Sequence, residues 1–294
     1  MKVIEPWQNI SLSKFTTWKI GGPAEWFAEP NSLEEIRNLI SWANQYQIPI
    51  KVIGAGSNLL VSDKGIDGLV ICLKHFHGYK LDKKHGILEA NSGEGLPRIA
   101  GLVAKAGLSG LEWAVGIPGT IGGATIMNAG AQGGCIGDQL ISTFVLPLDG
   151  GKPFSFTKKD LDMSYRQTLL QGEEFVVISS KFHLQPGGDP KEITAKTVNN
   201  LNQRKSTQPY EWPSCGSVFR NPEPRKAGEI IEKLGFKGYK QGGAEISKKH
   251  ANFIVNTGTA TAKDITTLIT HITTCVKDVY GISLQTEVKK LGFK

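Results

Sequence analysis

Two glycine-rich loops contain residues whose types and spacing could hold a phosphate or a flat ligand. The first, Gly54-Ala55-Gly56-Ser57-Asn58, follows a short apolar run and offers successive backbone N–H groups next to serine and asparagine side chains. Such a nest of donors can bind phosphate oxygens. It is not a dinucleotide fingerprint, because the third glycine is missing and the predicted helix precedes the loop. A structural tight turn explains this loop equally well.

The second loop is a longer tract, residues 116–134, which contains seven glycines and no charged residue. It is too apolar for a flexible linker. A glycine backbone lets a flat ligand or a diphosphate lie directly against the main chain. A buried, glycine-packed turn is the less favoured alternative, because the tract is long and accompanies the first loop.

Three further residues stand out only through a resemblance to a known family, and not through their types or spacing. Arg166 can bind a carboxylate through two parallel hydrogen bonds, while Ser217 and Glu287 can exchange protons. Taken singly, a surface ion pair, a turn hydrogen bond and a solvent-facing strand position explain them as well. Cys215 has no activating histidine adjacent in sequence, so we interpret it as a packing residue.

Composition favours a globular protein with an anionic partner. The chain has 294 residues, of which 39% are hydrophobic and 21% charged, and its net charge is +7. The 35 glycines are about 12% of the chain, against about 7% in average proteins. Basic residues are scattered rather than clustered, which disfavours nucleic acid. A nucleotide- or polyanion-binding module without catalysis remains an alternative that rests on charge alone.

Features missing from the sequence indicate where the protein is located and whether it binds a metal or a membrane. No apolar run is long enough to cross a bilayer, and the N-terminus has no secretory hydrophobic region. The four cysteines are far apart and lack zinc-site spacing. We therefore expect a cytoplasmic protein with no membrane partner and no metal; nothing in the sequence requires more than a monomer.

The helices and strands expected from the sequence indicate an α+β fold with two domains. A capping box at Ser32 and Glu35 predicts a helix between two strands, and a second box at Thr261 and Asp264 predicts a helix that ends at Gly281. The change of pattern near Gln203 predicts domains at 1–203 and 204–294, with residues 288–294 able to return to the first. The remaining expected elements are strands at 24–28, 50–53, 69–73, 87–90, 141–148, 153–156, 175–184, 252–256 and 282–288, and helices at 97–107, 190–204 and 227–234.

Short motifs spread over nearly the whole chain carry a family resemblance. They are Thr17–Ala24, Gly54–Asn58, Gly116–Gly123, Asn128–Gly130, Tyr165-Arg166, Gly216–Pro222, Gly242–Ala244, His250–Asn256 and Glu287. In this order they resemble the motifs of the UDP-N-acetylenolpyruvoylglucosamine reductase family. Any one motif alone is weak evidence, whereas the ordered set is strong.

The resemblance implies an FAD-binding domain of the vanillyl-alcohol-oxidase type, made of two α+β subdomains, and a smaller α/β substrate-binding domain. It also implies that NADPH reduces FAD, which then reduces an enolpyruvyl group on a UDP-sugar in peptidoglycan precursor synthesis. Neither glycine loop contains a histidine, so we expect FAD to be bound non-covalently. The FAD-binding residues that the resemblance implies are Gly54, Ala55, Gly56, Ser57, Asn58, Gly116, Pro118, Gly119, Thr120, Gly122, Gly123, Asn128 and Ala129.

The resemblance also assigns roles around the substrate. It implies that Arg166 stabilises the developing negative charge, that Ser217 donates a proton, and that Glu287 completes the site as a neutral acid. A neutral carboxyl group there requires a raised pKa. For the UDP-sugar it implies Tyr165, Lys205, Asn221 and His250, and an ordinary structural role explains His250 equally well.

Two departures from the family pattern leave contacts open. Family members often have Tyr-Gly-Gly-Glu where this chain has Gln132–Cys135, and serine where it has Thr168. The short span after Arg166 lacks a substrate-capping insertion found in one branch, so we expect the shorter type with a more open site. Another FAD-dependent oxidase or dehydrogenase of the same fold, acting on a sugar or alcohol, is the alternative; it would not need Arg166, Ser217 and Glu287.

Overall fold

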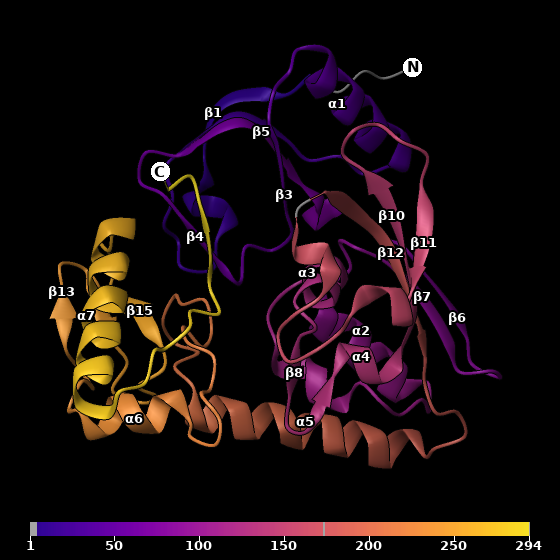
Figure 1. Cartoon of the computed structure of the whole chain (residues 1–294). Coiled ribbons are helices and arrows are strands. Elements are labelled where there is room, and N and C mark those ends of the chain that lie inside the picture. The colour runs from indigo at the N-terminus through magenta and orange to yellow at the C-terminus, as the bar shows by residue number, and fades with distance from the viewer. Residues whose placement is uncertain (1–4, 173, 294) are drawn as a thin grey trace. The chain divides into compact units, whose positions relative to one another are not determined.

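The computed structural model describes residues 5–172 and 174–293, which divide into two compact units (Figure 1). Unit 1 contains the described residues as far as Gln8, then Trp26–Ala55 and Gly68–Arg204; unit 2 contains Asn9–Glu25, Gly56–Asp67 and Lys205–Lys294. The sequence-based boundary at 203/204 is close to the division at Arg204. The structure differs in that it groups residues 9–25 and 56–67 with the C-terminal unit.

Three hydrophobic cores give the physical reason for this division. Trp18, Ile20 and Leu60 pack in the same buried cluster as Ile269 and other residues of the C-terminal segment. This cluster lies wholly in unit 2, whereas two separate clusters lie in unit 1. Buried apolar area is the main stabilising contribution, so these early residues belong with the core that they help to fill.

The first core of unit 1 surrounds a β-α-β unit. Helix α1 (Leu33–Gln45) buries Ile36, Leu39, Ile40 and Ala43 on one face, at the spacing expected of an amphipathic helix. Its N-cap Ser32 accepts a hydrogen bond from Glu35 N (3.2 Å), as predicted, but the Glu35 carboxylate accepts from Asn31 N (2.7 Å) instead of from Ser32. Strands β3 (Ile50–Ile53) and β5 (Ile66–Cys72) pair in parallel from Ile50↔Leu69 to Ile53↔Cys72.

The second core of unit 1 lies beneath a five-stranded antiparallel sheet of order β11-β10-β12-β7-β6. The predicted hairpin is confirmed, since β10 (Leu140–Pro147) pairs with β11 (Phe154–Thr157). Helix α3 (Ile121–Ile126) packs against β12 (Phe175–His183) and β7 (Ile87–Asn91), as Figure 1 shows. The remaining elements assigned to unit 1 are β6 (Tyr79–Asp82), α2 (Leu96–Lys105), β8 (Gly130–Ala131), β9 (Gly134–Cys135) and α4 (Ile136–Gln139), and 3-10 helices at Leu73–His75, Glu112–Gly116, Lys159–Leu161 and Leu169–Gly172.

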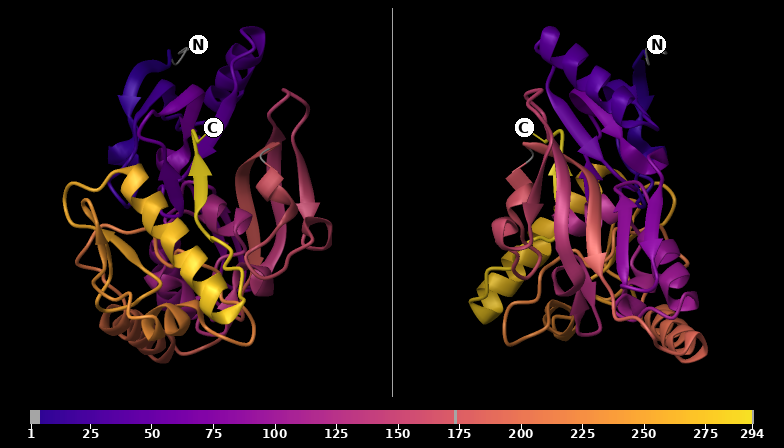
Figure 2. Two further views of the ribbon diagram at one scale, coloured as in Figure 1. Left: turned by 60° about the vertical axis from the view of Figure 1, so that its left-hand side comes forward. Right: turned by 90° about the vertical axis from the view of Figure 1, so that its right-hand side faces the viewer.

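Unit 2 has a three-stranded sheet, β13-β14-β15, covered by helix α7 (Ala262–Tyr280). Figure 1 and the left view of Figure 2 show α7 beside these strands. The Thr261–Asp264 capping box and the left-handed Gly281 (φ 67°) confirm the predicted ends of this helix. The other elements of this unit are β4 (Leu59–Val61), the 3-10 helix Leu12–Phe15, α6 (Ala227–Lys233), β13 (Lys240–Gln241), β14 (Ala244–Ile246), β15 (Ile254–Asn256) and β16 (Lys289–Leu291).

A few elements cross the division or end differently from the prediction. Strands β1 (Trp7–Ser11), β2 (Pro23–Ala28) and β5 and helix α5 (Pro190–Thr207) each contain residues of both units, and the first three belong to a sheet of order β1-β2-β5-β3. The predicted closing strand at 282–288 is wrong: only a single bridge, Phe219↔Thr286, forms there. The final strand is β16, which pairs in parallel with β4, because the Leu291 side chain is buried there.

Candidate active site

The first glycine loop is sterically restricted to glycine at two positions. Gly56 has φ +64°, and a Cβ on it would overlap the carbonyl oxygen of Phe15. A Cβ on Gly54 would lie 2.5 Å from Thr120 Oγ1, in the second glycine tract. The two loops singled out in the sequence therefore touch through Gly54 and Thr120, and neither glycine can carry a side chain without displacing its neighbour.

The second tract contains a helix that the sequence did not predict. Helix α3 begins after Thr120, whose Oγ1 accepts a hydrogen bond from Gly123 N (3.4 Å). Ile121 N donates to Glu94 O (2.8 Å) and Gly122 N donates to Ser92 O (2.9 Å). The first N–H groups of α3 are thus already bonded to protein, so donors for a diphosphate must come from elsewhere in the loops.

The residues of the two loops fit a flat, phosphate-bearing group such as FAD. Among the described residues, the backbone N–H groups of Ala55 and Ser57 have no hydrogen-bond acceptor. The buried Oγ of Ser92 likewise has no partner within the described residues, and a Cβ on Gly122 would come within 2.6 Å of the Ser92 Cβ. Unused donors next to bare glycine backbone are what binding of a diphosphate or a flat ring requires.

Arg166 lies at the tip of a tight turn that is locked onto the second tract. Ser164 and Gln167 exchange backbone hydrogen bonds (3.1 and 3.2 Å), which leaves Tyr165 and Arg166 as the two residues of the turn. Arg166 adopts φ +57°, a strained conformation for a non-glycine residue. Its Nη2 donates to Gly130 O (2.7 Å), and its guanidinium lies 5.0 Å from the centre of the Tyr165 ring.

Asn128 ties the same turn to the glycine tract from the other side. Its Nδ2 donates to Ser164 O (2.8 Å), and its Oδ1 accepts from Gly137 N (2.9 Å). The side chain is buried, and its φ of +40° is in the left-handed region that asparagine tolerates. The structure therefore brings together three residues predicted separately, Asn128, Tyr165 and Arg166, within unit 1.

The two departures from the family pattern have local structural roles. Gln132 and Gly133, both with positive φ, form the turn between β8 and β9, and Gln132 Nε2 donates to Gln203 Oε1 (2.9 Å) on α5. Cys135 caps α4, and burial together with the nearby Asp138 carboxylate raises the pKa of its thiol. Thr168 Oγ1 donates to Ile126 O (2.7 Å), which satisfies a carbonyl at the end of α3.

In unit 2 the segments that carry Ser217 and Glu287 run side by side. Glu287 N donates to Val218 O (2.8 Å), the residue after Ser217. The predicted flavin-loop residue Asn58 joins the same group, because its Nδ2 donates to Glu287 O (3.1 Å). Cys215 is buried, and burial raises the pKa of its thiol well above the ordinary value, with the Glu287 carboxylate adding to the effect. This supports a packing role for Cys215, since a protonated thiol is a poor nucleophile.

Three of the four predicted UDP-sugar residues, Lys205, Asn221 and His250, lie in unit 2. Asn221 Oδ1 accepts from Ala227 N (3.1 Å), at the start of α6. Lys205 is exposed near the end of α5, and its carbonyl accepts a hydrogen bond from Lys249 Nζ (2.6 Å). His250 Nδ1 accepts from Asn252 N (3.2 Å), which makes Nε2 the protonated nitrogen of the neutral ring.

The predicted site residues thus fall into two groups. Arg166 and Tyr165 belong to unit 1 with the second glycine tract, whereas Ser217, Glu287 and Asn58 belong to unit 2. Sequence reasoning missed Asn252, which lies in the His250–Asn256 motif and is bonded to the segment after Ser217. Only the motif itself could have indicated this residue.

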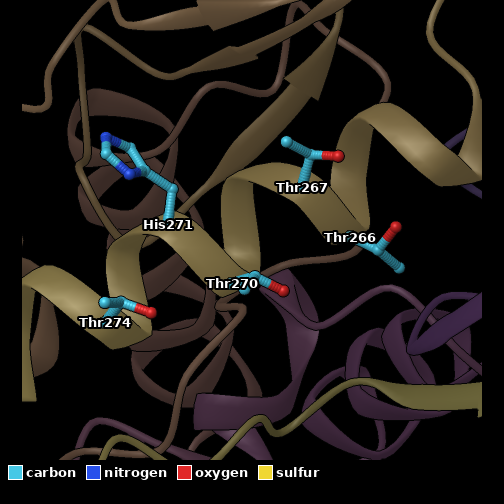
Figure 3. A pocket seen from close by; sticks show the side chains of 5 residues that line it. All are labelled: Thr266, Thr267, Thr270, His271 and Thr274. Atoms are coloured by element: carbon cyan, nitrogen blue, oxygen red, sulfur yellow. The ribbon is translucent and has the colours of Figure 1, made fainter.

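One surface pocket in unit 2 is unrelated to these residues. Figure 3 shows that its lining side chains, Thr266, Thr267, Thr270, His271 and Thr274, all project from α7. The hydroxyl groups of Thr266 and Thr267 donate back to carbonyls of the same helix. No residue predicted for the active site lines this pocket.

Two family models match parts of this chain. The family model for an FAD binding domain matches residues 24–151, and the model for the C-terminal domain of UDP-N-acetylenolpyruvoylglucosamine reductase matches residues 208–291. The reductase of Prochlorococcus marinus (strain MIT 9313) is 55% identical over 294 residues, covering 100% of this chain and 96% of the relative. The chain belongs to the UDP-N-acetylenolpyruvoylglucosamine reductase family.

Other relatives agree with this membership. The reductase of Synechococcus sp. (strain RCC307) is 55% identical over 97% of this chain and 93% of the relative. The crystal structure of the Thermus caldophilus UDP-N-acetylenolpyruvylglucosamine reductase matches with a TM-score of 0.82 at 34% identity, over 98% of this chain and 99% of that one. The expected α+β fold with an FAD-binding domain is confirmed, and the reductase is an FAD-containing oxidoreductase.

The residues that the structure describes contain neither a candidate membrane span nor a candidate metal cluster. In residues 5–172 and 174–293, no helix is both long and apolar enough to cross a membrane. Within the same ranges, no cluster of three or more histidine, cysteine, aspartate or glutamate residues is arranged to hold a metal ion.

Proposed function

We propose that Arg166, Ser217 and Glu287 are the catalytic residues with which this reductase converts UDP-N-acetylglucosamine-enolpyruvate to UDP-N-acetylmuramate. The protein carries out this step of peptidoglycan precursor synthesis with NADPH as the hydride donor. When bound, FAD would supply the hydride-transfer chemistry between NADPH and the substrate. The remaining work of binding, orientation and proton transfer is done by side chains of the chain itself.

The FAD would be held without a covalent bond by the two glycine loops. We propose Gly54, Ala55, Gly56, Ser57 and Asn58 in the first loop, and Gly116, Pro118, Gly119, Thr120, Gly122, Gly123, Asn128 and Ala129 in the second. The unused N–H groups of Ala55 and Ser57 support contacts to the diphosphate. The glycine positions support close approach of the backbone to the ligand.

Hydride addition to the terminal carbon of the enolpyruvyl double bond moves an electron pair toward the adjacent carboxylate. The resulting enolate-like charge needs cationic or donor groups in a fixed position. Arg166 supplies a guanidinium held by Gly130 O and by the Tyr165 ring. A neutral Glu287 can donate to the same charge, and Ser217 can then give its proton to the carbon that bears the carboxylate.

Binding of the UDP-sugar would use four further side chains. We propose Lys205 and Asn221 for the diphosphate, because an ammonium and an amide N–H both donate to phosphate oxygens. We assign His250 as a donor through Nε2, since its Nδ1 already accepts from Asn252 N. Tyr165, half exposed beside Arg166, would contact the sugar or its enolpyruvyl group.

The hydrogen bond from Glu287 N to Val218 O is the observation that best supports this proposal, because it joins the segment of the proton donor to the segment of the carboxyl group. The test is an anaerobic one. The purified protein is reduced with NADPH and mixed with the enolpyruvyl substrate, while the flavin absorbance is followed. We expect rapid reoxidation with one UDP-N-acetylmuramate formed per flavin. Reoxidation by other sugars or alcohols in place of this substrate would support the alternative oxidase or dehydrogenase.

We further propose that the reductase acts as a monomer in the cytoplasm, without a membrane or nucleic-acid partner. Its four cysteines are free thiols, which suits a reducing compartment. Light scattering of the purified protein at micromolar concentration measures the oligomeric state. A mass near 31.9 kDa is expected, and a mass of twice that value would contradict the monomer.

A further inference from the structure

The segment that follows Ser217, residues 218–220, is hydrogen-bonded on two sides. On one side, Val218 O accepts from Glu287 N (2.8 Å) and Arg220 N donates to Gln285 O (2.9 Å). On the other side the partner is a single residue, Asn252. Because bonds on two sides fix this backbone in place, the position of Ser217 depends on both partners.

Asn252 makes three hydrogen bonds to this segment. Its backbone carbonyl accepts from Val218 N (2.8 Å), its Oδ1 accepts from Phe219 N (2.9 Å), and its Nδ2 donates to Phe219 O (2.8 Å). The side chain is 3% exposed and Phe219 is 1% exposed, so water cannot replace these bonds. Removing the amide would leave a buried N–H and a buried C=O of Phe219 without partners.

The same residue also contacts the predicted substrate residue His250. Asn252 N donates to His250 Nδ1 (3.2 Å) and so sets which ring nitrogen carries the proton. One asparagine therefore joins the segment of His250 to the segment of Ser217, which in turn is bonded to the segment of Glu287.

We propose that Asn252 is a positioning residue for the proton-transfer step. It fixes Ser217 against Glu287 by holding Phe219 and Val218, without itself contacting the substrate. This inference rests on the proposed role of Ser217. It predicts a defect only in the half-reaction that uses Ser217, in which the enolpyruvyl group is reduced and protonated.

Asn256 provides a matched control in the same unit. It is also a buried asparagine, 4% exposed, whose amide donates to Trp18 O (2.9 Å) and whose Oδ1 accepts from Gly258 N (2.8 Å) and Ala260 N (3.1 Å). It makes no bond to Val218 or Phe219. If Asn252 had only a structural role, its replacement would slow the reaction no more than a replacement of Asn256 that lowers Tm equally.

The experiment compares Asn252→Ala and Asn256→Ala in rapid-mixing measurements of the two half-reactions. For Asn252→Ala we expect NADPH to reduce the flavin within twofold of the wild-type rate, and the enolpyruvyl substrate to reoxidise it at least about tenfold more slowly. For Asn256→Ala we expect both rates within twofold of wild type. In a Ser217→Ala background, Asn252→Ala should slow reoxidation by less than twofold, because the two residues act through one group.

Several results would overturn the inference. These are wild-type reoxidation in Asn252→Ala, equal slowing in Asn252→Ala and Asn256→Ala, or multiplied effects in the double variant. If Asn252→Ala does not fold, the same measurements are made on Asn252→Asp, which keeps the size and the acceptor for Phe219 N. If Ser217→Ala is reoxidised at the wild-type rate, the proposed role of Ser217 fails. If only Asn252→Ala is, the positioning role alone fails.

Discussion

The candidate active site is built in two different ways in two regions of the molecule. The glycine loops consist of bare backbone: Gly54 approaches Thr120 within unit 1, and Gly56 approaches Phe15 within unit 2, so closely that no side chain fits. The region around Ser217 consists of adjacent segments fixed by hydrogen bonds, in which Asn252 and Glu287 hold the segment that follows Ser217. The first arrangement depends on the absence of atoms, and the second depends on the presence of specific polar groups.

This difference determines how each half responds to mutation. Adding a methyl group to the glycine loops forces the backbone apart and should affect folding and FAD binding together. Removing a polar group near Ser217 leaves the glycine loops intact and should affect the chemistry selectively. Substitutions in the two regions therefore test this contrast.

Among substitutions in unit 1, Arg166→Lys should cause the largest fall in kcat/KM while FAD stays bound. A lysine cannot reproduce the bidentate geometry or the contact with the Tyr165 ring, so we expect kcat/KM to fall by about 10²- to 10³-fold. Steady-state kinetics with both substrates measures this. The control is Arg98→Lys, since Arg98 also lies over a tyrosine ring, that of Tyr79, but is 59% exposed. Equal losses in the two variants would contradict the assignment.

Gly56→Ala should destabilise the protein by about 3 kcal/mol, because the new Cβ overlaps Phe15 O and the positive φ adds strain. We expect a lower Tm and a reduced ratio of flavin to protein absorbance. Gly133→Ala separates the two causes, since Gly133 also has positive φ (+83°) but no atom within 4 Å of its Cβ position. It should cost only about 1 kcal/mol. A Gly56→Ala variant as stable as Gly133→Ala would contradict close packing of the loop.

Glu112 should make the stability of unit 1 depend on pH. Burial by itself would raise the pKa of this carboxyl, but hydrogen bonds from its own N–H and from Gly110 N, together with Lys196, lower it below its usual range. A lowered folded-state pKa contributes stability above the unfolded pKa, and this contribution disappears as the pH falls through the folded value. Glu112→Gln should therefore be less stable by about 1 kcal/mol at neutral pH.

The measurement is thermal unfolding of Glu112→Gln and wild type across pH. The difference in Tm should be constant at neutral pH and should close as the pH falls below about 4. Lys196→Gln removes only the ammonium partner and should produce a smaller difference. A difference in Tm that persists unchanged under acid conditions would show that Glu112 contributes through packing instead of charge.

Gly101→Ala should have the smallest effect, and of opposite sign. Gly101 lies within α2, and a Cβ there would meet no atom within 4 Å. Alanine has the higher helix propensity, so we expect a gain of about 0.5–1 kcal/mol in the free energy of unfolding. Denaturant titration measures this gain. A loss of stability would mean that glycine is required at this position too, and not only in the loops.

The same contrast explains how much could be predicted from the sequence. Locally coded features were predicted well: the Thr261–Asp264 box, the Gly281 stop and the hairpin of β10 and β11 each depend on residues close in the chain. The glycine loops were visible because an unusual residue type marked them. Their mutual contact through Gly54 and Thr120 was not, since those residues are far apart in the sequence.

Features that depend on distant partners were missed or wrong. Helix α3 lies in a glycine tract of low helix propensity and is stabilised by bonds to Ser92 O and Glu94 O. The strand predicted at 282–288 reduces to one bridge, because β16 pairs with β4 instead. Asn252 acts on Phe219, 33 residues earlier, so no local pattern indicates its role. Hydrogen-bonded positioning of this kind becomes visible only in the folded chain.

Proton donation by Ser217 beside Glu287 can be tested by one anaerobic measurement. It is the rate at which the enolpyruvyl substrate reoxidises the NADPH-reduced flavin of Ser217→Ala. Loss of a positioned general acid predicts slowing by about 10²- to 10⁴-fold, with NADPH reduction of the flavin unchanged. Reoxidation of Ser217→Ala at the wild-type rate would contradict the account.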